Sequence, residues 1–162
     1  IDTDPKHIME MMVSADQHRG TSFLEIYQNC VIFNDKVHDA YTNRQTRDDN
    51  TLYLEHGQPM LFGKEKNKGI RMKGFNLEVV TLGENGVSIS DILVHDKHNE
   101  VLAYQLLTFS DPPHFPMAIG VIFEKADNSY EKDFQEQVEM VKSKKGVKSV
   151  SQLLYSGETW KV

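Results

Sequence analysis

Cys30 is the residue of this chain with the clearest chemical potential, because it is the only cysteine among the 162 residues. A thiol beside a histidine base, here His38 or His56, is one arrangement for nucleophilic catalysis, but spacing alone does not show that the two groups meet. A free cysteine is also among the most often buried residues, where it acts as a small hydrophobe. The residue types therefore leave a chemical role and a packing role open.

Two further groups could do chemistry, and each has a simpler structural interpretation. His95 and His98 could place two imidazoles on one helical turn as metal ligands, but no third ligand is identifiable and surface loops commonly carry histidines. Three lysines near residue 145 could bind phosphate, but they also suit the negative end of a helix dipole (Lys142, Lys144 and Lys145). We favour the structural interpretation in both cases.

The element that must position Cys30 spans residues 20–30. Phe23, Leu24 and Ile26 place apolar side chains at or near adjacent positions instead of strictly alternating ones, which is typical of a strand covered on both faces in a parallel sheet. Ligands of open α/β sheets bind beyond the carboxyl ends of such strands, and Cys30 lies at that end. We therefore predict a buried, central, parallel strand over residues 20–30.

The other elements follow from caps, turns and apolar spacing. Asp4 and Pro5 begin a helix that stops before Gly20, and the polar residues 36–50 form a surface loop or short helix, with a boundary near residue 48. Beyond it we predict a hairpin of residues 51–55 and 59–62 about Gly57, followed by strands at 70–73 and 77–80. A short helix from Ser88 through Leu93 and a buried helix at 101–109 come next. The last predicted elements are a rigid proline turn at 111–116, an apolar strand at 117–123, and a helix that begins at Ser129 and ends at the lysines.

Composition narrows the class of protein. The formal net charge of -6 and the isoelectric point near 5.6 offer no general attraction to nucleic acid. A single cysteine excludes an internal disulfide scaffold. No apolar run reaches the ~20 residues of a membrane-spanning helix and no signal peptide is visible, so we expect no membrane association and a cytoplasmic location.

Residues 27–35, Tyr-Gln-Asn-Cys-Val-Ile-Phe-Asn-Asp, resemble a segment of the beta subunit of 2-oxoacid:ferredoxin oxidoreductases, most closely the 2-oxoglutarate type, 2-oxoglutarate synthase. The resemblance continues in family order through residues 54–63, 68–71, 91–96 and 116–121. It implies an α/β fold in which residues 1–48 end a thiamine-diphosphate-binding parallel-sheet domain. Residues 49–162 would then form a mixed α/β C-terminal domain.

The resemblance also implies a role for Cys30. The family's beta subunit binds thiamine diphosphate with Mg²⁺ and one 4Fe-4S cluster, and Cys30 stands where the fourth cluster cysteine falls. Asn34 and Asp35 would then lie near the cluster or cofactor, or else bond within their own loop. The other three cysteines and the diphosphate motif belong to the family's N-terminal half. We therefore expect this chain to be a C-terminal half that binds no cofactor and is inactive alone.

The implied reaction is the oxidative decarboxylation of a 2-oxoacid to acyl-coenzyme A with reduction of ferredoxin. The implied partners are the alpha subunit, ferredoxin, the 2-oxoacid and coenzyme A. The alternative is a noncatalytic α/β binding or subunit-assembly module in which the cysteine is buried and structural. As a fragment, the chain would lack part of the cover of its apolar strand, so we expect it to self-associate when it folds alone.

Overall fold

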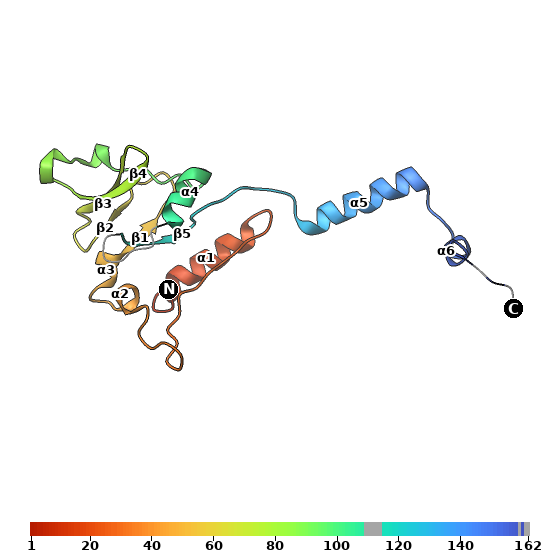
Figure 1. The fold of residues 1–162 in the computed structure, drawn as a ribbon, viewed down its shortest axis with the longest axis horizontal. Coiled ribbons are helices and arrows are strands. Elements are labelled where there is room, and N and C mark those ends of the chain that lie inside the picture. The colour runs from red at the N-terminus through yellow and green to blue at the C-terminus, as the bar shows by residue number, and fades with distance from the viewer. Residues whose placement is uncertain (109–114, 159, 161–162) are drawn as a thin grey trace. The chain divides into compact units, whose positions relative to one another are not determined.

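The computed structural model describes residues 1–108, 115–158 and 160, and Figure 1 shows its elements in chain order. The fold is mixed α/β, as predicted, and it falls into two compact units. The first comprises residues 1–18 and 22–125, and the second comprises residues 19–21 and 126–162. The predicted domain boundary near residue 48 stays a prediction.

Local signals correctly predicted the helices that precede the sheets. Helix α1, Pro5–Gln17, begins at its proline, and the Asp4 carboxylate accepts a hydrogen bond from the backbone N–H of His7 at 3.2 Å. The polar stretch that follows contains two single-turn helices, α2 (Asp39–Thr42) and α3 (Arg47–Asn50). These helices confirm the predicted polar connection.

Two small sheets form the centre of the first unit. Strand β1 (Thr51–Leu54) pairs in parallel with β5 (Met117–Gly120). An antiparallel sheet contains β2 (Leu61–Phe62), β3 (Lys68–Lys73) and β4 (Asn76–Thr81) in that order. The predicted strands at 70–73 and 77–80 are thus confirmed, and the strand predicted at 117–123 is shorter than expected.

The hairpin predicted for residues 51–62 is wrong, because β1 and β2 belong to different sheets. Gly57 does have a positive φ of 78°. However, its N–H donates to the carbonyl of His95 at 2.8 Å, and the N–H of Met60 donates to the carbonyl of Leu93 at 2.9 Å. The connection is therefore tied to residues 93–95, and it does not fold β2 back onto β1.

One apolar cluster joins both sheets to helix α4, Glu100–Leu107. Leu102 and Leu106 of α4 are buried, whereas Val101 and Tyr104 are about 70% exposed, so the helix buries one face only. Two short 3-10 helices, η1 (Glu84–Gly86) and η2 (Ile89–Asp91), precede α4, and η2 has the predicted Ser88 cap. Phe109 and most of the predicted proline turn lie outside the described residues. The core comprises Leu52, Leu54, Met60, Phe62, Ile70, Leu102 and Leu106.

The buried parallel strand predicted at residues 20–30 is wrong for this chain. Residues 22–29 belong to no strand, and the Phe23 side chain is 90% exposed. Adjacent apolar residues form a central strand only where strands on both sides supply hydrogen bonds. Here the Tyr27 carbonyl instead accepts from the N–H of Asp2, at the N-terminal turn, and β1 and β5 pair with each other.

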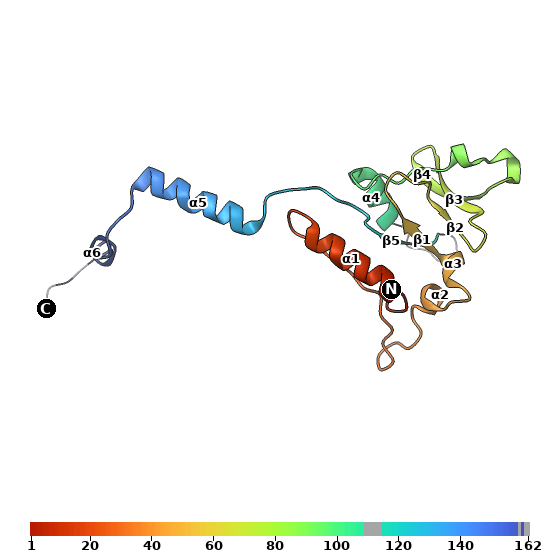
Figure 2. The same ribbon diagram turned by 180° about the vertical axis from the view of Figure 1, so that it is seen from behind.

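The second unit contains α5 (Tyr130–Lys145) and α6 (Val150–Leu154), which Figure 2 shows from the opposite side. The Ser129 hydroxyl accepts from the N–H of Lys132 at 3.3 Å, and lysines occupy the last turn of α5, as predicted. Neither helix has a buried residue. None of the helices in the described part of the chain is long and apolar enough to cross a membrane.

Candidate functional site

Cys30 lies in an exposed segment between α1 and α2. We call residues 29–36 the Cys30 loop. It forms a single bridge with Asn34, whose backbone N–H donates to the Cys30 carbonyl at 3.0 Å. The thiol is free and exposed. The alternative of a buried structural cysteine is therefore wrong for this chain, because the loop carries the thiol to the surface and no core residues enclose it.

Backbone N–H groups of the same loop influence the Cys30 thiol. The N–H groups of Phe33, Ile32 and Asn34 hold the pKa of the thiol below its ordinary value, although burial opposes this effect. Successive N–H groups that converge on one point form an anion-binding concavity, which favours the thiolate over the thiol. The thiolate is the form of cysteine that binds metals. The loop therefore presents an accessible thiol of lowered pKa, which suits a metal or cluster ligand.

The Asn29 side chain closes this loop from both directions. Its Oδ1 accepts from the N–H of Lys36 at 2.8 Å, and its Nδ2 donates to Oδ1 of Asp35 at 3.0 Å. Lys36 adopts a left-handed backbone conformation with φ of 62°, which turns the chain out of the loop. Of the two roles predicted for Asp35, the structure shows the bond within its own loop.

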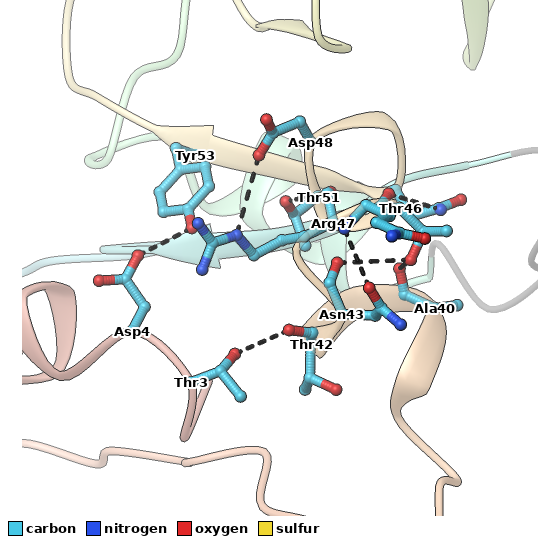
Figure 3. A network of polar contacts seen from close by, with 12 residues as sticks. Thr3, Asp4, Ala40, Thr42, Asn43, Thr46, Arg47, Asp48, Thr51 and Tyr53 are labelled. Carbon is cyan, nitrogen blue, oxygen red and sulfur yellow. Dashed lines mark hydrogen bonds and ion pairs between the residues drawn. The ribbon is translucent and has the colours of Figure 1, made fainter.

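Three consecutive residues at the start of the chain attach this loop to the rest of the first unit. Oδ2 of Asp2 accepts from the backbone N–H of Asn29 at 3.1 Å. The next two attachments are visible in Figure 3: the Thr3 hydroxyl donates to the carbonyl of Thr42 in α2, and the Tyr53 hydroxyl of β1 donates to Asp4 at 3.0 Å. The N-terminal turn therefore fixes the Cys30 loop, α2 and β1 relative to one another.

The hydrogen bond between Asp4 and Tyr53 shifts the pKa of both side chains. Burial and then the Asp4 hydrogen bond raise the pKa of Tyr53 to about 12. Burial alone would raise the pKa of Asp4, but the His7 N–H, the Tyr53 hydroxyl and the Arg47 charge outweigh it and lower that pKa. The His7 ring also packs edge-on against Tyr53, with the ring centroids 5.2 Å apart. The pair is thus held as a neutral phenol that donates to a charged carboxylate.

The structure does not bring Cys30 together with a histidine base, and it shows no histidine metal site among the described residues. The His38 ring packs edge-on against Tyr27 and the His56 ring against His98, and no described contact joins either ring to Cys30. His95 is 1% exposed, and its Nε2 lies 2.9 Å from the carbonyl oxygen of Val121. Among the described residues no three His, Cys, Asp or Glu side chains are grouped to hold a metal ion.

A groove of about 580 Å³ opens beside Tyr53, and no motif in the sequence indicated it. Its charged lining is balanced between Asp48 and Glu55 on one hand and Lys64 and Lys66 on the other, so it favours neither sign of ligand. The remaining lining residues are Thr51, Tyr53, Gln58, Pro59, Leu61, Phe62, Gly63 and Ile89.

Comparison with known proteins relates the whole chain to one kind of enzyme subunit. The chain is 29% identical, over 166 aligned positions, to the 2-oxoglutarate oxidoreductase subunit KorB of Mycobacterium tuberculosis (strain ATCC 25618 / H37Rv). The alignment covers 100% of this chain and 44% of that relative, so the chain spans less than half of the relative's length. No protein-family model matches the chain, and no solved structure matches it. The similarity supports a relationship to a KorB-like beta subunit of an oxidoreductase.

Sequence reasoning selected Cys30, Asn34 and Asp35 but missed the residues that position them. The position of Asn29 could have been predicted to close a turn, because asparagine and aspartate side chains commonly bond to backbone groups of nearby turns. Tyr53 carried none, since its partner Asp4 lies 49 positions away. Hydrogen bonds of that range become visible only when the fold is known.

Proposed function

We propose that this chain is the C-terminal part of the beta subunit of a 2-oxoacid:ferredoxin oxidoreductase of the 2-oxoglutarate type, and that Cys30 supplies one thiolate to its 4Fe-4S cluster. The observation that carries the proposal is the exposed Cys30 thiol, whose pKa is lowered by three backbone donors. The similarity to KorB along the full chain supports the class of enzyme.

The residues of the loop fit one corner of such a cluster. Hydrogen bonds to the sulfur ligands are among the features that set the reduction potential of an iron–sulfur cluster, and the N–H groups of Phe33, Ile32 and Asn34 already lower the pKa of Cys30. Since this chain has one cysteine, the other three thiolates must come from outside it. When bound, the cluster would accept electrons singly, and thiamine diphosphate with Mg²⁺ would carry the decarboxylation. We assign no residue here to thiamine diphosphate, the 2-oxoacid or coenzyme A.

The apolar side chains of the loop fit a covered position in the complete enzyme. Val31, Ile32 and Phe33 are 73%, 82% and 90% exposed, although they adjoin the thiol. Covering them would exclude water from the cluster, and solvent exposure is one of the factors that set its potential. We propose that the preceding part of the subunit or the alpha subunit provides this cover, that ferredoxin is the electron acceptor, and that the enzyme is cytoplasmic.

The test is Cys30→Ala in the full-length subunit. A cluster iron that loses its thiolate must take another ligand or be lost, so we expect less iron and sulfide, or an altered electron paramagnetic resonance signal of the reduced cluster. Ferredoxin reduction should fall much more than thiamine diphosphate binding. Val37→Ala is the matched control, because it truncates an exposed apolar side chain next to the same loop and leaves both the thiol and the proposed cover.

Unchanged iron content and electron transfer in Cys30→Ala would remove the proposed ligand role. The loop would then belong to a noncatalytic assembly module, whose exposed apolar side chains serve only to bind another subunit. Equal losses in Cys30→Ala and Val37→Ala would likewise contradict the proposal, because they would trace the effect to packing of this segment.

A further inference from the structure

Helix α5 carries an apolar stripe that contains exposed aromatic side chains. Tyr130, Phe134, Val138 and Val141 are spaced by four, four and three residues, which places them on one side of the helix. Tyr130 is 77% exposed and Phe134 is 53% exposed. Helices of about this length are marginal alone in water and gain most of their stability from packing an apolar face. The stripe therefore requires a partner surface.

Acidic side chains predominate in the N-terminal part of α5, and basic side chains predominate in its last turn. All of its acidic residues precede its basic ones, with Lys132 the exception. At 100° per residue, Glu131 and Lys142 border one side of the stripe, and Asp133 and Lys144 border the other side. Each border is therefore acidic near the N-terminus of the helix and basic near its C-terminus. The acidic residues are Glu131, Asp133, Glu136 and Glu139, and the remaining basic residues are Lys142, Lys144 and Lys145.

We propose that α5 is a self-association surface, which pairs with α5 of a second copy of this chain in antiparallel orientation about a two-fold axis near Val138. In that register Phe134 of one copy faces Val141 of the other, and Tyr130 faces the alkyl stem of Lys145. Each contact then occurs twice, as in any two-fold interface. The proposal rests on α5 alone and is independent of the function of the Cys30 loop.

The borders of the stripe decide the orientation of the pair. In the antiparallel register Glu131 approaches Lys142 of the second copy, and Asp133 approaches Lys144, so both borders carry opposite charges. A parallel pair would instead place acidic residues beside acidic residues and lysines beside lysines. Lys142 already bonds to Glu139 of its own helix at 2.7 Å, but exposed pairs of this kind are weak and can exchange partners.

The same charge pattern argues against a membrane as the partner. Helices that lie on membrane surfaces have polar faces rich in lysine and arginine. The polar face of α5 carries four acidic and four basic side chains, and anionic lipids would repel its acidic half. Charge complementarity therefore favours a second copy of the chain.

The first test measures self-association of the 162-residue chain by sedimentation, from roughly 1 µM to roughly 1 mM. We expect a reversible dimer that salt weakens, because opposite charges attract at its borders. Phe134→Asp should weaken the dimer at least about tenfold, since it places an uncompensated charge in the stripe. Met140→Asp is the control, because it makes a comparable change at a 49% exposed position of α5 outside the stripe.

Three results of that experiment would overturn the proposal. A chain that is monomeric throughout has no such interface. Association that salt strengthens would indicate like charges at the borders. Association that survives Phe134→Asp but is lost in Phe23→Asp would place the interface on residues 22–29, where Phe23 is 90% exposed. Circular dichroism of each variant shows whether helix content is kept.

The second test fixes the orientation by disulfide trapping in a Cys30→Ser background. An antiparallel pair brings Val138 beside its symmetry mate, so Val138→Cys should cross-link to itself. The two Tyr130 positions would lie about 20 Å apart along the axis at about 1.5 Å per residue, so Tyr130→Cys should cross-link only when mixed with Lys145→Cys. Self-cross-linking of Tyr130→Cys, or no cross-linking of Val138→Cys, would refute the antiparallel pair.

Discussion

Removal of the Tyr53 hydroxyl tests whether the N-terminal turn stabilises the first unit. In Tyr53→Phe the chain loses the 3.0 Å hydrogen bond to Asp4 while the ring remains against His7. A hydrogen bond to a charged group contributes about 1.5–3 kcal/mol when well buried, and Tyr53 is only half-buried. We therefore expect the free energy of unfolding to fall by about 1–2 kcal/mol at neutral pH, measured by urea denaturation.

The pH dependence of this difference is the more specific prediction. The pKa of Tyr53 is raised to about 12 in the folded chain, so its stabilising contribution is complete below the ordinary tyrosine pKa and is lost as pH rises toward 12. Two pKa units correspond to at most about 2.7 kcal/mol, which we reduce to about 1 kcal/mol because solvent screens a half-exposed group. The wild-type and Tyr53→Phe stabilities should therefore converge between pH 10 and 12.

The acid limit and the controls complete this test. The pKa of Asp4 is lowered in the folded chain, so its contribution is present above the unfolded carboxyl pKa and is lost as pH falls through the folded value. Asp4→Asn keeps a good helix cap and removes the charge, which allows a double-mutant cycle with Tyr53→Phe. Tyr104→Phe is the control, because Tyr104 is 71% exposed. Equal costs for Tyr53→Phe and Tyr104→Phe, or parallel stability curves to pH 12, would refute the reasoning.

Two further predictions concern the loop and the sheet. Asn29→Ala removes both side-chain bonds that close the Cys30 loop, so the thiol pKa should rise toward its ordinary value. Alkylation of Cys30 at neutral pH should then slow, and an unchanged rate would show that Asn29 does not position the donors. Gly120→Ala should cost about 3 kcal/mol or more, because φ there is 118° and a Cβ would lie 2.9 Å from the Leu54 carbonyl oxygen. Gly57→Ala, with φ of 78° and open space, should cost only about 1 kcal/mol, and equal costs in urea denaturation would contradict the clash.

Elements defined by neighbouring residues could be predicted from the sequence. Helices α1 and α5 were predicted correctly, because their signals lie within a few positions of each other. Helix α1 has its cap at Asp4 and a proline at Pro5, and α5 has its cap at Ser129 followed by helically spaced apolar residues. Strands β3 and β4 were also predictable, because they pair across a short turn at Gly74. In each case the signal and the structure it specifies lie in the same segment.

Elements defined by distant partners could not be predicted in this way. The residues after β1 look like a turn, but hydrogen bonds to His95 and Leu93 determine their path. The apolar run at residues 22–29 indicates burial without saying which surface provides it, and within this chain Phe23 has no cover. The sequence therefore indicated an apolar segment that ends at Cys30, but not the exposed loop that presents the thiol, and the ligand role of Cys30 stays a prediction.

The residues of the Cys30 loop give a physical reason why metal binding and the burial of its apolar side chains should be coupled. Covering Val31, Ile32 and Phe33 would remove water from the adjacent Cys30 sulfur, and desolvation alone raises a thiol pKa and favours the neutral form. That cost opposes the three backbone donors, which favour the thiolate. A bound iron would let the Cys30 sulfur stay deprotonated under such cover, because the metal's positive charge would take the place of the proton. Under the proposed function, cluster binding and the covering of this loop therefore stabilise each other.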